Sequence, residues 1–235
     1  MSTSRPTVAD VGSTFWEDEI TVNQQEVTAI DLLLEPDLTM IQPAADANAR
    51  LLALFPKGFA LDEVHRPHIT VLQRYVHTND LDTVYAAAAS VLADTPLAEM
   101  QLTAFRYYYI GWNDIGLAGI VVEPTAELHR LQQRLIDAVM PFTADTATAD
   151  AFITTPQDPE INQPTIDYVA GFVSLGAGTN YNPHVTVGMA LKDDLDEMLA
   201  ETFTPFTFGV VGAAAYQLGN FGTASKLLRS WTLDG

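Results

Sequence analysis

The stretch Pro-His-Ile-Thr-Val at residues 67–71 recurs almost letter for letter as Pro-His-Val-Thr-Val at residues 183–187. Each copy alternates polar residues with β-branched apolar ones, which is typical of a strand with one buried face. Because successive side chains of a strand point to opposite faces, the His and the Thr of each copy share a face. Only five histidines occur in the chain, and two of them stand at equivalent places in these pentapeptides.

Two such strands facing one another would gather two imidazoles and two hydroxyls around one cavity. His68 and His184 are candidates for proton transfer, because the unperturbed imidazole pKa of about 6.5 suits both an acid and a base. Thr70 and Thr186 are candidates for binding phosphate oxygens. The repetition favours a functional interpretation, since a single His-x-Thr is a weak pattern.

Each motif is preceded in the sequence by a similar strand and helix. A strand over residues 29–34 ends at Glu35-Pro36, and a matching strand ends at Glu123-Pro124. Helices are predicted after these strands, over residues 42–55 and 125–140. The other predicted elements are motif strands at 67–76 and 182–190, helices from residue 79 or 80 and from 193 or 194 to about 201, and strands at 99–110, 115–123, 204–212 and 225–233.

The spacing of these similar segments indicates a pseudo-repeat with an insertion. Glu35 and Glu123 are 88 positions apart and the two motif histidines 116, which leaves 28 extra residues in the second half. We place them at residues 143–170, a stretch rich in Thr, Ala, Asp and Pro that mostly lacks periodicity and reads as a surface excursion. The predicted organisation is an N-terminal arm over residues 1–25 and a single two-lobed domain over residues 26–235.

Composition excludes several classes of protein. Of the 235 residues, 48% are hydrophobic and 17% charged, which is typical of a compact globular protein. There is no cysteine, which excludes disulfides, thiolate catalysis and Cys-based zinc sites. No apolar run reaches the length of about 20 residues needed to cross a bilayer. The N-terminal residues lack the pattern of a signal peptide, so we predict a cytoplasmic protein without a membrane partner.

The net charge of −19 bears on possible partners. Non-specific nucleic-acid binding relies on Lys and Arg that neutralise phosphates, so an acidic surface disfavours long nucleic acid. A small phosphate-containing ligand remains compatible with this charge.

The paired motifs resemble those of the two-histidine (2H) phosphoesterase superfamily, and the pattern is most similar to its 2′-5′ RNA ligase and RNA 2′,3′-cyclic phosphodiesterase group. The resemblance covers residues 26–233. It implies an α+β fold with two antiparallel sheets facing each other across a central cleft and helices outside. It also implies catalysis without a metal or other cofactor, with His68 and His184 as acid and base and with Thr70 and Thr186 on the non-bridging phosphate oxygens.

Two further residues are weaker candidates for substrate binding. By alternation Arg74 shares a strand face with His68, although it lies about 20 Å along the strand and a solvated strand end is an equal alternative. Tyr181, just before the second motif, is a candidate for stacking on a base, although core packing is the commoner fate of such a residue. A zinc site built from His65, His68 and His184 is disfavoured, because the extended chain around Pro67 puts His65 and His68 on opposite faces.

The sequence therefore predicts a metal-independent phosphodiesterase for a small phosphodiester, such as a nucleoside 2′,3′-cyclic phosphate or a 2′-5′-linked nucleotide. One alternative is a nucleotide-binding module of the same fold without turnover. The other is a 2′-5′ RNA ligase acting on RNA, which would require a basic cleft. The sequence does not reveal which histidine is the acid and which the base.

Overall fold

The computed structural model describes residues 26–156 and 158–233, so the predicted N-terminal arm lies outside the described residues. Its strands are β1 (Val27–Pro36), β2 (Ile69–His77), β3 (Gln101–Trp112), β4 (Ile115–Val122), β5 (Thr143–Ala144), β6 (His184–Leu191), β7 (Phe206–Leu218) and β8 (Ala224–Thr232). Its α-helices are α1 (Leu38–Leu54), α2 (Leu81–Ala93), α3 (Ala126–Val139), α4 (Gln163–Gly176) and α5 (Lys192–Ala200). None of the described helices has the length and apolar composition needed to cross a membrane.

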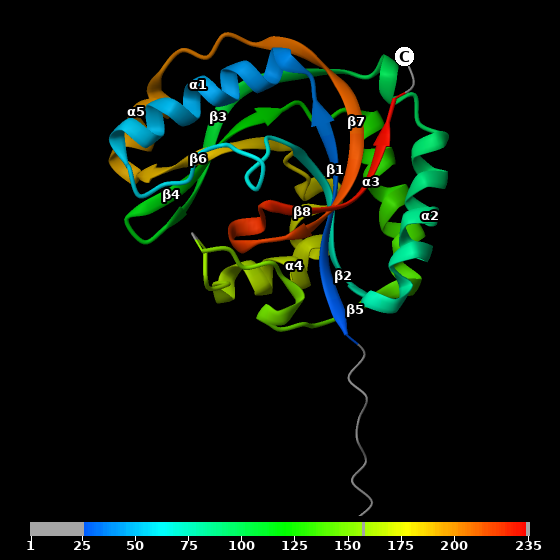
Figure 1. Cartoon of the computed structure of the whole chain (residues 1–235). Helices are drawn as coiled ribbons and strands as arrows, with labels where there is room; N and C mark the ends of the chain where they lie inside the picture. Colours follow the sequence, from blue (N-terminus) through cyan, green and yellow to red (C-terminus); the bar gives the residue numbers. More distant parts are fainter. Residues whose placement is uncertain (1–25, 157, 234–235) are drawn as a thin grey trace, which may run out of the picture.

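The fold is α+β and antiparallel, as predicted, but hydrogen bonds join the eight described strands into one sheet with two lobes rather than into two separate sheets (Figure 1). The first lobe has the order β5-β2-β1-β7-β8, and the second lobe has the order β6-β4-β3. Hydrogen bonds continue from one lobe into the other where residues 101–104 of β3 pair with residues 206–209 of β7. A single pair between Ile69 and Val185 also joins the two motif strands. The motifs therefore lie side by side, although 116 residues separate them along the chain.

The helices cross over between the lobes. Helix α1 follows β1 but packs against β6, whereas α3 follows β4 but packs against β2. Helix α2 packs against α3, and α5 contacts the second lobe, so the pairs α1 with α5 and α2 with α3 lie on two different sides of the sheets in Figure 1. Side chains cap the N-termini of α1 and α3. Asp37 accepts a hydrogen bond from the backbone N–H of Thr39, and Thr125 accepts one from that of Leu128.

The apolar face of each motif strand lies in the core, as the alternation predicts. Ile69 and Val71 of β2 and Val185 and Val187 of β6 are at most 1% exposed. Burial of a side chain of this size stabilises the fold by about 1.5–3 kcal/mol. The opposite faces are thereby oriented away from the core, which is what brings the polar residues of the motifs to the cavity described below.

The predicted insertion contains more regular structure than expected. Residues 163–170 form the first part of α4, which packs against β2 rather than standing out as a surface loop. Asn162 caps this helix, and Pro164 stands in its first turn, where proline is well tolerated. Thr165, Val169 and Phe172 are buried at helical spacing. Strand β7 also exceeds the predicted range of 204–212, because its second half pairs with β1 as far as Gln217.

Candidate active site

The four motif residues meet at one cavity. His68, Thr70, His184 and Thr186 all line a cavity of about 570 Å³ between the lobes. The first two residues come from the β2 side and the last two from the β6 side. The structure thus brings together the residues that the repeated pentapeptides predicted.

Both imidazoles are held by the same local device. Nδ1 of His68 lies 2.6 Å from the carbonyl oxygen of Arg66, and Nδ1 of His184 lies 2.8 Å from that of Asn182. Because a carbonyl oxygen only accepts, each Nδ1 carries a proton and donates it. This arrangement fixes the tautomer and leaves Nε2 of each ring for proton transfer.

The surroundings of the two histidines differ. Burial beside the positive charge of His68 lowers the pKa of His184 to about 4. Burial also acts to lower the pKa of His68, but contact with the Asp31 carboxylate outweighs it and raises that pKa above the ordinary value. The two pKa values are therefore moved in opposite directions, towards a protonated His68 and a neutral His184.

Asp31 is a site residue that sequence reasoning missed. It lies on β1, is fully buried, and accepts a hydrogen bond from the Thr70 hydroxyl at 2.8 Å. Its Oδ2 lies 3.4 Å from Nε2 of His68. The available signal was the carboxylate of Asp31 in the middle of the apolar run AIDLLL of β1, where a charged residue is costly unless it has a partner.

The structure brings Gln73 to the cavity, and Arg74 is not among the lining residues. The register of β1 against β2 shifts between Leu32 and Leu33, whose partners are Leu72 and Thr70. This β-bulge breaks the alternation on which the prediction for Arg74 depended. The Arg74 guanidinium instead lies 3.5 Å from the hydroxyl of Thr143.

The second motif strand has a matching bulge. Thr186 pairs with Gly119, whereas the next pair along the ladder joins Gly188 to Ala118. Gly188 has a φ of 140°, a conformation that favours glycine. Met189 consequently lines the cavity at the place that Gln73 occupies in the first half.

Tyr181 lines the cavity but is only 6% exposed. Its hydroxyl donates a hydrogen bond to the carbonyl oxygen of Thr70 at 3.1 Å, and its ring packs edge-on against His129. Stacking of this ring on a substrate stays a prediction. The geometry shows a hydrogen bond between Tyr181, three residues before His184, and Thr70 of the first motif strand.

Much of the rest of the cavity lining is apolar. It includes Ile110, Ile115, Leu117, Tyr168, Phe172 and Leu175. Trp112 and Phe221 also line the cavity, and their ring centroids lie 5.5 Å apart. Among the described residues that line the cavity there is no Asp, Glu, Lys or Arg.

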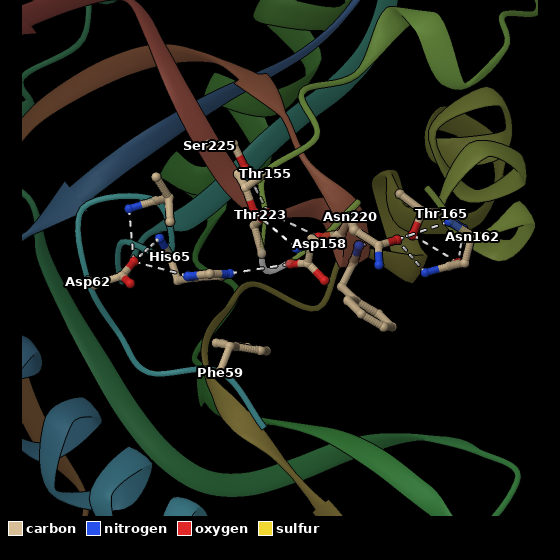
Figure 2. Close-up of polar contacts among 12 residues, drawn as sticks. Phe59, Asp62, His65, Thr155, Asp158, Asn162, Thr165, Asn220, Thr223 and Ser225 are labelled. Carbon is tan, nitrogen blue, oxygen red and sulfur yellow. Dashed lines mark hydrogen bonds and ion pairs between the residues drawn. The ribbon is translucent and has the colours of Figure 1, made fainter. Parts of the chain in front are cut away.

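A polar network fixes the turn that carries Phe221 (Figure 2). Oδ1 of Asn220 accepts hydrogen bonds from the backbone and side-chain nitrogens of Asn162, at 3.0 and 2.6 Å. The backbone N–H of Phe221 donates to the Thr165 hydroxyl at 3.0 Å. The start of α4 therefore sets the position of an aromatic ring that belongs to the β7–β8 turn.

His65 lies in a bend before β2 and does not line the cavity. Nδ1 of His65 lies 3.0 Å from Asp62, and its Nε2 lies 3.6 Å from Asp158 in the segment before α4 (Figure 2). The ring stacks on Phe59 with centroids 4.9 Å apart. His65 thus connects the loop before the first motif to the predicted insertion.

Comparison with known proteins extends these observations. A family model described as the 2′-5′ RNA ligase superfamily matches residues 43–218. The crystal structure of TT0787 of Thermus thermophilus has a TM-score of 0.51 and 16% identity, over 88% of this chain and 99% of that one. Escherichia coli LigT complexed with phosphate has a TM-score of 0.37 and 13% identity, over 89% of this chain and 99% of that one.

Usb1 of Kluyveromyces marxianus has a TM-score of 0.44 and 8% identity, over 89% of this chain and 99% of that one. A comparison with curated proteins found no match. At this level of identity, the likeness to TT0787 shows a shared fold.

Proposed function

The chain belongs to the 2′-5′ RNA ligase superfamily, and from this premise we propose that it is a metal-independent phosphodiesterase for a small phosphodiester. A nucleoside 2′,3′-cyclic phosphate or a 2′-5′-linked nucleotide is the proposed substrate. The observation that carries the proposal is the convergence of His68, Thr70, His184 and Thr186 on one cavity.

The chemistry of the reaction matches this set of residues. Hydrolysis of a phosphodiester needs a base that deprotonates water on one side of phosphorus and an acid that protonates the leaving oxygen on the other. A positioned histidine typically supplies a factor of about 10² to 10⁴ in either task. Two imidazoles that are both anchored through Nδ1 and biased towards opposite protonation states support an acid–base pair.

The size and charge of the cavity support a small substrate. A volume of about 570 Å³ lies in the range of sites for small molecules. The lining has no Lys or Arg among the described residues, so nothing there matches the repeated charges of a long RNA. An RNA ligase would be favoured by a basic cleft, and a lining without Lys or Arg among the described residues counts against that alternative.

The test is turnover in the presence of EDTA, with a panel of nucleoside 2′,3′-cyclic phosphates and 2′-5′ dinucleotides. We expect wild-type turnover and a loss of at least about 100-fold in both His68→Ala and His184→Ala. His77→Ala is the matched control, because His77 ends the same strand β2 but does not line the cavity.

Near-full activity in either motif variant would rule out the two-histidine mechanism. Absence of turnover on the whole panel, with nucleotide binding retained in calorimetry, would favour the binding-module alternative.

A further inference from the structure

Asp31 stands out among the charged residues. It is the only buried Asp, Glu, Lys or Arg in the described part of the chain. Its Oδ2 receives hydrogen bonds from Thr70 at 2.8 Å and from the Gln73 amide at 3.1 Å, and it lies 3.4 Å from Nε2 of His68. Its Oδ1 is buried without a hydrogen-bond partner among the described residues. A buried carboxylate with an open acceptor is unfavourable unless a positive charge compensates it.

The second half of the fold lacks this carboxylate. In the first half, Asp31 pairs across the strands with Gln73, the fifth residue after His68. In the second half, the fifth residue after His184 is Met189, which pairs with Leu117. The two places correspond in register, and both pairs follow the matching bulges. The polar Asp–Gln pair of the first half is therefore replaced by an apolar Leu–Met pair at the corresponding register of the second half.

We propose that Asp31 is a positioning residue that keeps His68 protonated as the general acid, while His184, whose half of the fold has an apolar pair in place of Asp31 and Gln73, stays neutral as the general base. This assignment rests on the proposed function. Asp31 acts through His68, since the carboxylate faces the imidazole and is itself fully buried. At 3.4 Å the contact is an ion pair that is longer than an ordinary hydrogen bond, so the Nε2 proton stays available to a substrate.

The other charges around His68 act in a consistent way. The charge of Glu35, also on β1, helps Asp31 to raise the pKa of His68, whereas the burial of His68 acts to lower that pKa. Arg66, in the loop before the motif, lies 3.7 Å from Glu35 and pairs with it. His184 faces His68 from β6, and the positive charge of His68, after burial, helps to lower the pKa of His184. These charges thus favour a proton on His68 and disfavour one on His184.

The step balances with these roles. The oxygen of water forms a bond to phosphorus, and its proton passes to Nε2 of His184. The bond from phosphorus to the leaving oxygen breaks, and that oxygen takes the proton from Nε2 of His68. A cyclic phosphodiester and water become a phosphomonoester. The two imidazoles have exchanged protonation states, and proton exchange with solvent restores them.

The first experiment needs no turnover. NMR titration of the histidine ring protons, assigned with His68→Ala and His184→Ala, should show that His68 titrates at higher pH than His184. Asp31→Asn keeps the shape of the side chain and removes its charge, so the titration of His68 should move to lower pH by about one unit or more. The reverse order in the wild type, or an unmoved His68 in a folded Asp31→Asn protein, would overturn the proposal.

The second experiment is the pH profile of kcat/KM on a nucleoside 2′,3′-cyclic phosphate. An acid must be protonated, so activity is lost as the pH rises through its pKa. In Asp31→Asn this alkaline limb should move to lower pH, with a loss of about tenfold at pH 8 that is largely recovered at pH 6. Glu35→Gln is the matched control on the same strand and should move the limb less, because Glu35 does not contact the imidazole.

A uniform loss in Asp31→Asn across the whole pH range would mean a merely structural role and would overturn the assignment. If no phosphodiester is turned over by the wild type, the proposed function fails. The NMR titrations then decide separately whether Asp31 holds His68 protonated.

Discussion

The hydroxyl of Tyr181 donates a hydrogen bond to the carbonyl oxygen of Thr70 at 3.1 Å. The bond spans 111 positions of the chain and joins the segment just before His184 to strand β2, which begins directly after His68. The relative position of the two imidazoles therefore depends on contacts between the halves as well as on each motif strand.

Tyr181→Phe removes this bond but keeps the ring. We expect a loss of about 1 kcal/mol in the free energy of unfolding, because the carbonyl oxygen of Thr70 loses a donor. We also expect a several-fold loss in kcat with little change in KM. Tyr75→Phe is the control. The Tyr75 hydroxyl donates a similar hydrogen bond, of 2.8 Å, to the carbonyl oxygen of Ile166, and Tyr75 does not line the cavity. A rise in KM alone would instead favour substrate stacking on Tyr181.

The wild-type enzyme should keep its activity at mildly acidic pH. The base must be neutral, and burial beside His68 lowers the pKa of His184 to about 4, so activity is lost only as the pH falls towards that value. We expect kcat/KM to change less than twofold between pH 7 and pH 5.5. A base with an ordinary pKa of about 6.5 would lose roughly eightfold over the same interval. Such a loss in the measured profile would contradict the assignment of His184 as base.

Trp112 should contribute to the recognition of an aromatic group on the substrate. Its ring lines the cavity beside Phe221 and is 38% exposed. Stacking of a base on an aromatic side chain contributes about 1–3 kcal/mol, so Trp112→Ala should raise KM for a nucleoside 2′,3′-cyclic phosphate about fivefold or more. The matched control is ribose 2′,3′-cyclic phosphate, which has no base. An equal effect on both substrates would exclude stacking.

Helix α4 should restrict the size of the substrate. Tyr168 on α4 lines the cavity and is 39% exposed. We expect Tyr168→Ala to raise the ratio of kcat/KM for 2′-5′ dinucleotides over mononucleotides by about threefold or more. Met140→Ala is the control, as another exposed apolar residue that does not line the cavity. Point substitution is preferable to deletion, because Val169 and Phe172 of the same helix are buried.

An unchanged ratio in Tyr168→Ala would mean that the Tyr168 side chain does not restrict the size of the substrate. The same measurement on Asn162→Ala would then test whether α4 acts indirectly, through the turn that carries Phe221.

Much of the fold could be predicted from local patterns. Alternation predicted the buried faces of the motif strands, and an apolar run ending in Glu-Pro in both halves predicted two similar units. Helix α4 was missed although its buried residues have helical spacing, because the Thr-, Asp- and Pro-rich stretch before it resembles a loop. The structure shows that Asn162 and Pro164 in that stretch start a helix.

The sequence by itself determined which groups the two motifs present together, because His-x-Thr on a strand places an imidazole and a hydroxyl on one face wherever that strand lies. Tertiary structure decided which other residues join them. The bulges after Thr70 and Thr186 exchange the residues that face the cavity, so Gln73 replaces Arg74. The pairing of β1 with β2 places Asp31 beside His68. Such contacts depend on register between distant strands, and a one-residue change in register reverses the face that each side chain occupies.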